Sequence, residues 1–237
     1  MKKVDVIIPC FNENKNIKRL VSSWSKALSA EKSISVYFIN NGSTDNTGML
    51  LKKEIELSSS KNLNVLEIKK NIGYGHGIKH GIQNTKSEII CWTHADLQIP
   101  VFDVINIIKK YQSNNNNQNY LYKGNRNKRK IFDLLFTKLM SFAGLLFTGI
   151  YINDINAQPK IFSRSNVADF INYPDDFTID AHILYSHKKK NKLIQSHNST
   201  FLERTGNEPK GGGSLIGKIN LSFKTISYFI NFNKYFI

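Results

Sequence analysis

The stretch Ile89-Ile90-Cys91-Trp92-Thr93-His94-Ala95-Asp96-Leu97-Gln98-Ile99-Pro100 carries the strongest signal in the chain. Its apolar start, Ile89 to Trp92, predicts a buried strand. If the chain stays extended, Asp96 and Gln98 point to the same side and offer a carboxylate and an amide oxygen to one point. Hard divalent cations such as Mg²⁺ or Mn²⁺ prefer such oxygen ligands. The alternative is a strand that ends in a polar turn, stopped by Pro100, with no metal.

Strand, turn and helix alternate four times in the first half of the chain. We expect strands at residues 4–9, 35–39, 63–68 and 88–93, each followed by a helix that ends near residue 30, 57, 84 or 111. Continuous apolar runs such as Val4 to Pro9 suit parallel strands that are buried on both faces. The order therefore predicts an α/β fold whose mostly parallel, twisted sheet has helices on both faces. In such sheets ligands bind outside the carboxyl ends of the strands, where Asp96 lies.

The second half of the chain is less regular. We expect strands at residues 120–123, 157–163 and 193–202, and helices at residues 131–147, 167–171 and 177–189. The tail is amphipathic, with one apolar helical face formed by Ile216, Ile219, Phe223, Ile226 and Ile230. We therefore divide the chain into a domain of residues 1–214 and a C-terminal amphipathic tail of residues 215–237. The tail either packs on the domain or lies on a membrane surface.

The charge balance indicates an anionic partner. The chain has 237 residues, with 33 Lys and Arg against 18 Asp and Glu, which gives a formal net charge of +15. Nucleic acid, a membrane surface and phosphorylated substrates all fit that charge. No nucleic-acid-binding motif occurs in its expected context, so we expect no nucleic acid partner. Cys10 and Cys91 lie in apolar runs and fit core thiols of a reducing compartment.

The sequence also bears on location. The N-terminus enters a strand directly, without the apolar region of a signal peptide. The run from Leu134 to Ile152 is the best candidate for a membrane span. Asp133 and Lys138 interrupt it, and the uncharged part is shorter than the roughly 20 residues that a bilayer requires. We therefore expect a cytoplasmic protein without a spanning helix.

A glycine string, Gly73-x-Gly75-x-Gly77, follows a strand and opens a helix. It fits either a dinucleotide-binding fingerprint or a tight turn with close packing of helix on sheet. The string belongs to the third strand–helix unit rather than the first, and its spacing is not that of the fingerprint. These two departures favour the tight turn.

Charged side chains follow several of the expected strands. Arg126 and Arg129 come after one strand, and Arg204 and Lys210 lie in a late Gly-rich loop. They are either solvated turn residues or groups that stabilise the negative charge of a diphosphate. Asp180 lies near a helix start, where it either complements the helix dipole or acts as a base.

Together these segments resemble the family-2 glycosyltransferases of the GT-A fold, and most closely the dolichol-phosphate and polyprenyl-phosphate sugar transferases. Five segments occur in the family's order. They are Ile7-Ile8-Pro9-Cys10-Phe11-Asn12-Glu13, Asn40-Asn41-Gly42-Ser43-Thr44-Asp45, Asn71-x-Gly73-x-Gly75, His94-Ala95-Asp96-Leu97-Gln98, and the pair Arg204 and Lys210. In the family, the first two contact the nucleotide, base and ribose, the third is a turn, and the fourth holds the metal.

The resemblance implies transfer of a sugar, with inversion, from a nucleotide-diphosphate donor to a polyprenyl-phosphate or glycan acceptor. It implies a divalent cation, Mg²⁺ or Mn²⁺, held by Asp96 and Gln98. The implied substrate-binding residues are Pro9, Asn12, Glu13, Asn41, Gly73, His94, Arg126 and Arg129, and the implied catalytic residues are Asp96, Asp180, Arg204 and Lys210. Asp180 would take the proton of a sugar hydroxyl, whereas a lipid phosphate needs no base. A lipid acceptor implies peripheral contact with the inner face of the membrane.

The departures from the family pattern leave alternatives open. His94 replaces the first Asp of the metal motif, and Asn40 and Asn41 replace two acids, so the metal affinity and the base preference stay open. A catalytically inactive, basic nucleotide- or membrane-binding module is one alternative. A sugar nucleotidyltransferase is another, although it would need a Gly-rich triphosphate loop after the first strand. Segment 154–160 resembles the family's acceptor segment only loosely.

Overall fold

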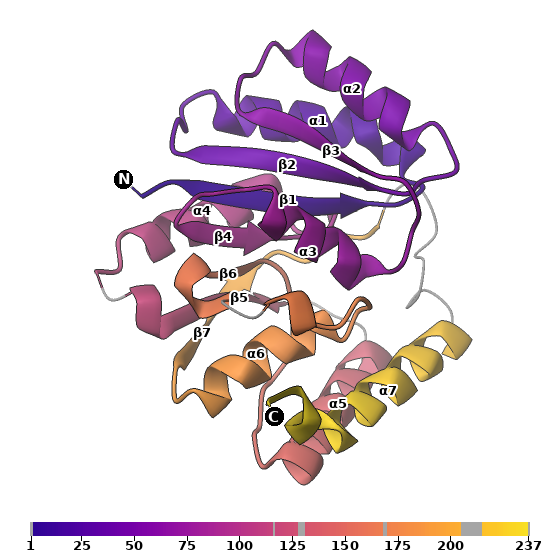
Figure 1. Cartoon of the computed structure of the whole chain (residues 1–237), viewed down its shortest axis with the longest axis vertical. Coiled ribbons are helices and arrows are strands. Elements are labelled where there is room, and N and C mark those ends of the chain that lie inside the picture. Colours follow the sequence, from indigo (N-terminus) through magenta and orange to yellow (C-terminus); the bar gives the residue numbers. More distant parts are fainter. Residues whose placement is uncertain (1, 116, 128–130, 168–169, 205–214, 237) are drawn as a thin grey trace.

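The computed structural model describes residues 2–115, 117–127, 131–167, 170–204 and 215–236. Within these ranges one seven-stranded sheet has the order β3-β2-β1-β4-β6-β5-β7 (Figure 1). The strands are β1 (Val4–Cys10), β2 (Ile34–Asn41), β3 (Leu63–Ile68), β4 (Ile89–Trp92), β5 (Tyr120–Arg126), β6 (Lys160–Ser163) and β7 (Leu193–Ser199). Only β6 runs antiparallel to its neighbours β4 and β5. The predicted α/β fold with a mostly parallel sheet is therefore confirmed.

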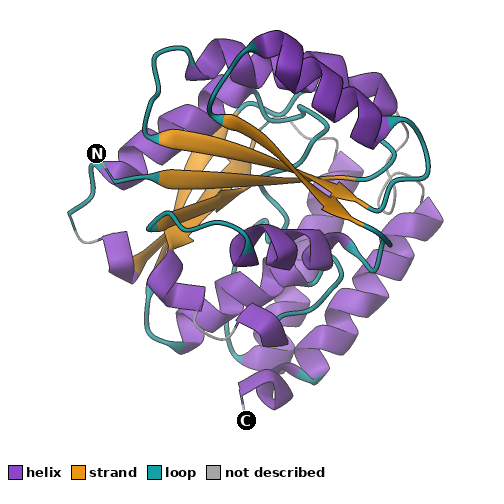
Figure 2. Cartoon of the chain, turned by 45° about the horizontal axis from the view of Figure 1, so that its top comes forward, coloured by secondary structure: helices purple, strands orange, loops and turns teal. Residues whose placement is uncertain are grey.

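Helices cover both faces of the twisted sheet, as predicted (Figure 2). They are α1 (Asn14–Leu28), α2 (Thr47–Ser58), α3 (Tyr74–Gln83), α4 (Val101–Gln112), α5 (Ile131–Thr148), α6 (Ile179–Lys189) and α7 (Leu215–Ile230). Alternate residues of a strand face opposite sides. Val6 and Ile8 therefore pack with α1 and α4, and Ile7 packs with α3 and α6. The short helix expected at 167–171 was wrong: two 3₁₀ turns, Arg164–Val167 and Phe170–Asn172, stand there instead.

The strand register brings the predicted site residues to one edge of the sheet. Cys10 lies beside Asn40 on β2, so the carboxyl ends of β1 and β2 coincide. Trp92, the last residue of β4, lies opposite Lys160, the first residue of β6. Because β6 is antiparallel, its amino end meets the carboxyl ends of its neighbours. Lys160 therefore joins an edge that the sequence assigned only to parallel strand ends.

The helices α5 and α7 lie side by side at the edge of the molecule farthest from β3 (Figure 1). Small residues face inward on α5: Ser141 and Gly144 are its buried residues. A Cβ atom added to Gly144 would lie 1.8 Å from the Tyr185 hydroxyl of α6, so only glycine permits this approach. From the C-terminal end, Phe229 and Phe232 are buried against Tyr185.

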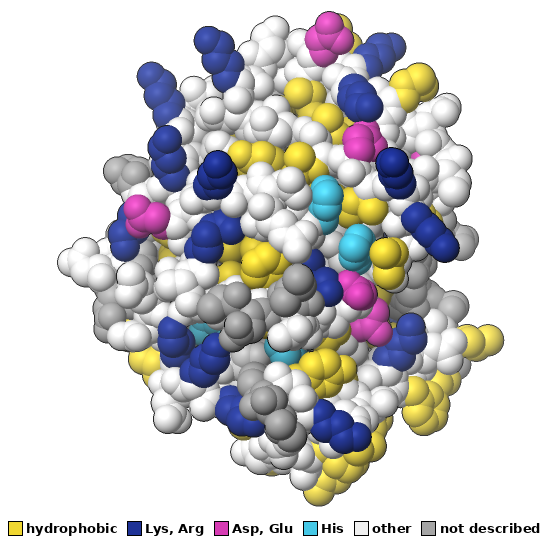
Figure 3. Space-filling model, viewed as in Figure 1, with side chains coloured by type: hydrophobic (Ala, Val, Ile, Leu, Met, Phe, Trp, Pro, Cys, Tyr) yellow, Lys and Arg dark blue, Asp and Glu magenta, His cyan; other side chains and the backbone are white. Residues whose placement is uncertain are grey.

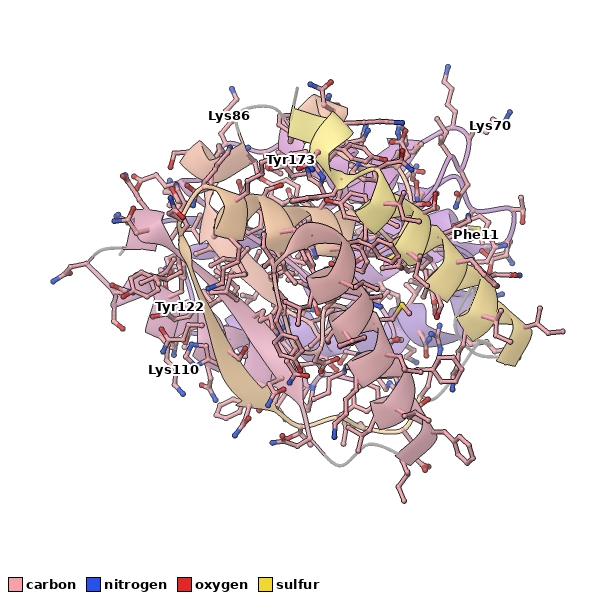
Figure 4. All side chains as sticks on the ribbon, turned by 90° about the horizontal axis from the view of Figure 1, so that it is seen from below. Phe11, Lys70, Lys86, Lys110, Tyr122 and Tyr173 are labelled. Atoms are coloured by element: carbon pink, nitrogen blue, oxygen red, sulfur yellow. The ribbon has the colours of Figure 1, made fainter. Side chains whose placement is uncertain are left out.

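The outer faces of α5 and α7 are apolar. Figure 4 views the two helices from below, and Figure 3 shows apolar side chains gathered along the lower right edge of the molecule. Exposed apolar residues on these helices include Ile131, Phe132, Leu135, Leu139, Phe142, Leu146, Ile216, Phe223 and Ile230. By length and composition alone, α5 is long and apolar enough to cross a membrane, with 18 residues and a mean hydropathy of 1.6. The helix continues through Asp133 and Lys138, and the expectation that this run does not span a membrane stays a prediction.

Candidate active site

A cleft of about 690 Å³ opens at the edge where β1, β2, β4 and β5 end. That volume suits a small-molecule ligand. The cleft is lined by ten of the residues predicted from the sequence, namely Pro9, Glu13, Asn41, Gly73, His94, Asp96, Gln98, Arg126, Asp180 and Arg204. Two further predicted residues, Arg129 and Lys210, lie outside the described residues. The structure thus brings together residues from seven separate parts of the sequence.

Asn12 is the predicted residue that does not line this cleft. Its carboxamide oxygen accepts a hydrogen bond from the backbone N–H of Thr44, at 2.9 Å, and its own backbone N–H donates to Ser43 Oγ, at 3.1 Å. Asn12 has a positive φ of 53°, a conformation that asparagine tolerates better than most residues. It therefore ties the loop after β1 to the loop after β2.

The metal motif is a turn rather than an extended strand. Leu97 has a φ of 56°, so the chain reverses between Asp96 and Gln98. The Gln98 backbone N–H donates to Asp96 Oδ1, at 3.1 Å. The assumption that the two side chains align by strand alternation is thus wrong, although both still line the cleft. Gln98 also exchanges hydrogen bonds with Leu202, at 2.8 and 3.3 Å, and this holds the late loop beside the motif.

Two carboxylates face one guanidinium in the cleft. Arg204 donates from Nη2 to Glu13 Oε1, at 2.8 Å, and from Nη1 to Asp96 Oδ2, at 3.3 Å. Burial raises the pKa of Glu13, while the hydrogen bond from Asn16 and the charge of Arg204 lower it. The two carboxylates thus already surround a cation.

The chemistry of these side chains fits a hard divalent cation. The Asp96 carboxylate and the Gln98 amide oxygen are the kinds of ligand that Mg²⁺ and Mn²⁺ take. Among the described residues, no group of three or more His, Cys, Asp or Glu side chains is arranged to hold a metal. The protein would therefore supply few ligands, as is usual where substrate phosphates and water complete the coordination shell of Mg²⁺.

Asn41 and Gly73, the first glycine of the string, also line the cleft. The Asn41 side chain is buried and donates from Nδ2 to the Gly73 carbonyl, at 2.9 Å. Gly73 has a φ of 152°, and a Cβ atom there would lie 2.2 Å from the Asp175 carbonyl oxygen. A Cβ atom at Gly77 would lie 3.1 Å from the Asn41 side chain. The string therefore serves close packing, as the sequence favoured.

A buried ion pair joins Asp180, which lines the cleft, to Lys160, which does not. Asp180 accepts hydrogen bonds from Trp92 Nε1, at 2.9 Å, from Gln158 Nε2, at 3.0 Å, and from Lys160 Nζ, at 3.2 Å. Burial lowers the pKa of Lys160, and the Asp180 carboxylate raises it again. Three donors therefore fix the Asp180 carboxylate in place. Its role as a base stays a prediction.

Arg126 is held in place by Asp154. Its Nε donates to both carboxylate oxygens, at 3.1 and 3.2 Å, and its Nη2 donates to Oδ1. Lys123 reaches the same segment from below and donates to the Asp154 carbonyl, at 3.1 Å. Burial lowers the pKa of Lys123 to about 7. Asp154 therefore contacts two basic side chains: its carboxylate holds Arg126 beside the cleft, and its carbonyl accepts a hydrogen bond from the buried Lys123.

Sequence reasoning missed two parts of the cleft. Tyr74 stacks on Phe177 with ring centroids 4.7 Å apart, and the His94 ring meets Tyr74 edge-on at 5.5 Å. No pattern in the sequence distinguished these aromatic residues from core residues. The far wall comes from α5 and α7, with lining residues such as Met140 and Lys224. The apolar stripe of the tail was the one signal that pointed there.

A comparison with protein families gives the decisive observation. The model of the family described as "Glycosyl transferase family 2" matches residues 5–152, which is more than half of the chain. The chain belongs to glycosyl transferase family 2. The predicted enzyme class is therefore confirmed. The matched range contains β1 to β5 and the metal motif, whereas Asp180 and Arg204 lie beyond it.

Solved structures agree with the predicted GT-A fold of this family 2 protein. One is glucosyl-3-phosphoglycerate synthase from Mycobacterium tuberculosis in complex with Mn²⁺, uridine diphosphate and glucosyl-3-phosphoglycerate. It has a TM-score of 0.70 and 13% sequence identity, and the match covers 97% of this chain and 79% of that one. The same enzyme with Mn²⁺, UDP-glucose and phosphoglyceric acid has a TM-score of 0.70 and 14% sequence identity, and the match covers 97% of this chain and 79% of that one. With Mg²⁺ and uridine diphosphate, the same enzyme has a TM-score of 0.70 and 14% sequence identity, and the match covers 97% of this chain and 78% of that one.

Proposed function

We propose that this protein transfers a sugar from a nucleotide-diphosphate donor to a lipid phosphate of the polyprenyl-phosphate type, with Mg²⁺ or Mn²⁺ as cofactor. A glycan hydroxyl is the second candidate acceptor. The observation that carries the proposal is the meeting of Glu13, Asp96 and Arg204 in a cleft at the carboxyl ends of the strands. The fold neighbours bound to Mn²⁺ with UDP-glucose, or to Mg²⁺ with uridine diphosphate, support the donor class and the cofactor.

The donor would occupy the wall formed by the loops after β1, β2 and β4. Asn41 and Gly73 border the space for the base, and Asp96 and Gln98 would hold the divalent cation. When bound, that cation neutralises the charge of the leaving diphosphate. Arg204 would add charged hydrogen-bond donors to the phosphates. Arg129 and Lys210 keep the phosphate-binding roles that the resemblance implies for them.

The hydrogen bonding of Asp180 favours a phosphate acceptor over a hydroxyl. A phosphate oxygen is already anionic, so it can attack the anomeric carbon while the bond from that carbon to the diphosphate oxygen breaks. No proton has to be removed, and direct displacement inverts the anomeric centre. A hydroxyl acceptor would require Asp180 to accept a proton while its carboxylate is paired with Lys160. Arg126, fixed by Asp154, is available beside the cleft to bind the acceptor phosphate.

The far wall of the cleft suits an acceptor with an apolar chain. Phe136 and Met140 from α5 and Leu221 from α7 line it, together with the ammonium-bearing Lys224. The outer faces of the same two helices expose large apolar side chains. Amphipathic helices of this kind lie in the membrane interface, and basic proteins are drawn to anionic lipids. We therefore propose peripheral binding at the inner, cytoplasmic face of the membrane.

Calorimetric titration with uridine diphosphate and guanosine diphosphate, in Mn²⁺ and in EDTA, tests the donor side. We expect one nucleotide to bind wild type only when Mn²⁺ is present. Asp96→Ala should abolish this Mn²⁺-dependent binding. Asp133→Ala is the matched control, since it removes a carboxylate from the far end of the same cleft. If neither nucleotide binds wild type under any condition, the donor assignment fails.

The acceptor test offers the nucleotide sugar with three acceptors in parallel: a polyprenyl phosphate in detergent, glycerol 3-phosphate and a neutral oligosaccharide. Product on the polyprenyl phosphate alone supports the proposal. Product on glycerol 3-phosphate instead identifies a small phosphorylated acceptor, like the ligands of the fold neighbours. Nucleotide binding without transfer or donor hydrolysis would favour the inactive binding module. Formation of pyrophosphate from a nucleoside triphosphate would favour the nucleotidyltransferase.

A further inference from the structure

Glu13 is fixed by the protein so that one carboxylate oxygen faces Arg204. Its backbone N–H donates to Thr47 Oγ1, at 2.8 Å, and its Oε2 accepts a hydrogen bond from Asn16 Nδ2, at 2.6 Å. Oε1 is thereby left to accept from Arg204. A side chain that serves only as a solvated turn residue does not need this support. The support indicates that the position of Oε1 matters.

Glu13 and Asp96 together require a cation. The exposed fractions of these residues are only 7% each, and buried carboxylates are costly unless they are paired. Arg204 now supplies the positive charge to both of them, and its side chain is 19% exposed. Nη1 pairs with Asp96 and Nη2 pairs with Glu13, so the guanidinium lies between the two carboxylates. A metal ion bound to Asp96 on this side would have to displace it.

We propose that Glu13 and Asp96 form a single cation site, which Arg204 fills in the ligand-free protein and which a divalent ion takes over when the donor binds. Glu13 then becomes a second carboxylate ligand of the ion, beside Asp96. The displaced guanidinium becomes free to bind the diphosphate that arrives with the ion. This inference rests on the proposed function for the identity of the donor, but the exchange of cations itself can be measured without any donor.

The exchange predicts that the metal binds weakly without nucleotide, because it must compete with Arg204. Mn²⁺ titration of the nucleotide-free protein, followed by the electron paramagnetic resonance signal of free Mn²⁺, measures this affinity. Arg204→Gln should bind Mn²⁺ about tenfold more tightly than wild type, a gain of about 1.4 kcal/mol. The double variant Glu13→Gln with Arg204→Gln should lose that gain, because one carboxylate is missing.

Lys224→Gln is the matched control for charge. Lys224 lines the same cleft, and among the described residues its ammonium takes part in no hydrogen bond or ion pair. Removing this cation should change Mn²⁺ affinity by less than about twofold, since its effect on the site is long-range and screened. An equal gain in Lys224→Gln and Arg204→Gln would overturn the proposal in favour of general electrostatics. The proposal would also be overturned if Arg204→Gln bound Mn²⁺ no more tightly than wild type.

Failure of this inference and failure of the proposed function give different results. If Arg204→Gln gains Mn²⁺ affinity but no nucleotide binds, the cation site stands and the donor assignment falls. If nucleotide binding depends on Mn²⁺ but Arg204→Gln gains nothing, the function stands and the exchange falls. Thermal unfolding followed by circular dichroism confirms that each variant is folded, and Arg204→Ala replaces Arg204→Gln if the latter does not fold.

Discussion

At the scale of single residues, the ion pair between Lys160 and Asp180 is the most constrained feature of the site. Both side chains are almost completely buried. Asp180→Asn should lower the free energy of unfolding by about 3 kcal/mol, because it leaves a buried cation without its partner. Chemical denaturation with urea measures this. Adding Lys160→Met to Asp180→Asn should cost less than the sum of the two single changes, because no unpaired charge remains.

Additive costs would contradict that prediction and would mean that Asp180 is not tied to Lys160. Asp180 would then be available as a base, and a hydroxyl acceptor would become the better reading of the cleft. The stability measurement therefore also bears on the chemistry. Asp175 provides a control, because it forms an ion pair with Lys79 while its own side chain is about half exposed. Asp175→Asn should cost about 1 kcal/mol or less.

The sequence predicted which residues form the site better than it predicted how they are held. Asp96, Gln98 and Arg204 were predicted from residue types and order that are typical of one chemistry, and the structure places all three at the cleft. The positive φ of Leu97 left no signal, since leucine does not favour that conformation. Lys160 was not predicted as the partner of Asp180, because its position depends on the antiparallel direction of β6. Direction and register are set by tertiary packing, which local patterns do not encode.

At the scale of elements, the docking of α5 depends on one missing side chain. Gly144→Ala would bring a methyl group to within 1.8 Å of the Tyr185 hydroxyl, which should destabilise the protein by about 1–3 kcal/mol through overpacking. Tyr185→Phe should restore part of this loss by removing the hydroxyl oxygen. Alone, Tyr185→Phe should be nearly neutral, because that buried hydroxyl has no hydrogen-bond partner among the described residues. Thermal melts of the three variants test the docking, and no rescue in the double variant would argue against it.

The two buried histidines of α6 should make stability depend on pH. Burial lowers the pKa of His182 and of His187 to about 4, below the unfolded value of about 6.5. The unfolded chain therefore takes up protons first as the pH falls. Stability should be complete above about pH 6.5 and should fall toward pH 4, by on the order of 3 kcal/mol per histidine.

Melting temperatures measured from pH 8 to pH 4 test this dependence. His187 Nε2 is buried and has no partner in the described part of the chain, so a protonated ring would bury an unsatisfied donor. His187→Phe should therefore flatten the decline. The Tyr228 hydroxyl of α7 lies 3.0 Å from His182 Nδ1, so protonation of His182 would place a charge at the contact between α6 and α7. A melting temperature that is constant down to pH 4.5 would contradict both expectations.

Helices and strands were predictable because apolar residues recur at their characteristic spacings, and most boundaries fall within a few residues of the expected ones. The side on which α7 packs was not predictable. Its C-terminal end buries Phe229, while the predicted stripe of Ile216 and Phe223 points outward. A helix with apolar residues on several sides has no single buried face that periodicity can identify. The packing partners α5 and α6 decide which side is covered.

At the scale of the whole molecule, charge and apolar surface are distributed differently. The chain has 33 basic against 18 acidic residues, and Lys and Arg side chains are scattered over the face seen in Figure 3. The large exposed apolar side chains instead concentrate on α5 and α7. This combination predicts that basic residues over much of the surface attract the protein to an anionic membrane, and that only α5 and α7 insert apolar side chains into it.

Cosedimentation with vesicles separates these two contributions. Wild type should bind vesicles that contain anionic lipid, and it should bind less as salt is added, because screening weakens the attraction. Phe132→Ser combined with Phe223→Ser should weaken binding by at least about tenfold, since each buried Phe side chain contributes about 1.5–3 kcal/mol. Phe102→Ser is the matched control: Phe102 is 70% exposed on α4, against 76% for Phe132 and 67% for Phe223. If the double variant and Phe102→Ser weaken vesicle binding equally, or if neither weakens it, the α5–α7 surface is not the membrane contact. A soluble phosphorylated acceptor then becomes the better expectation for the cleft.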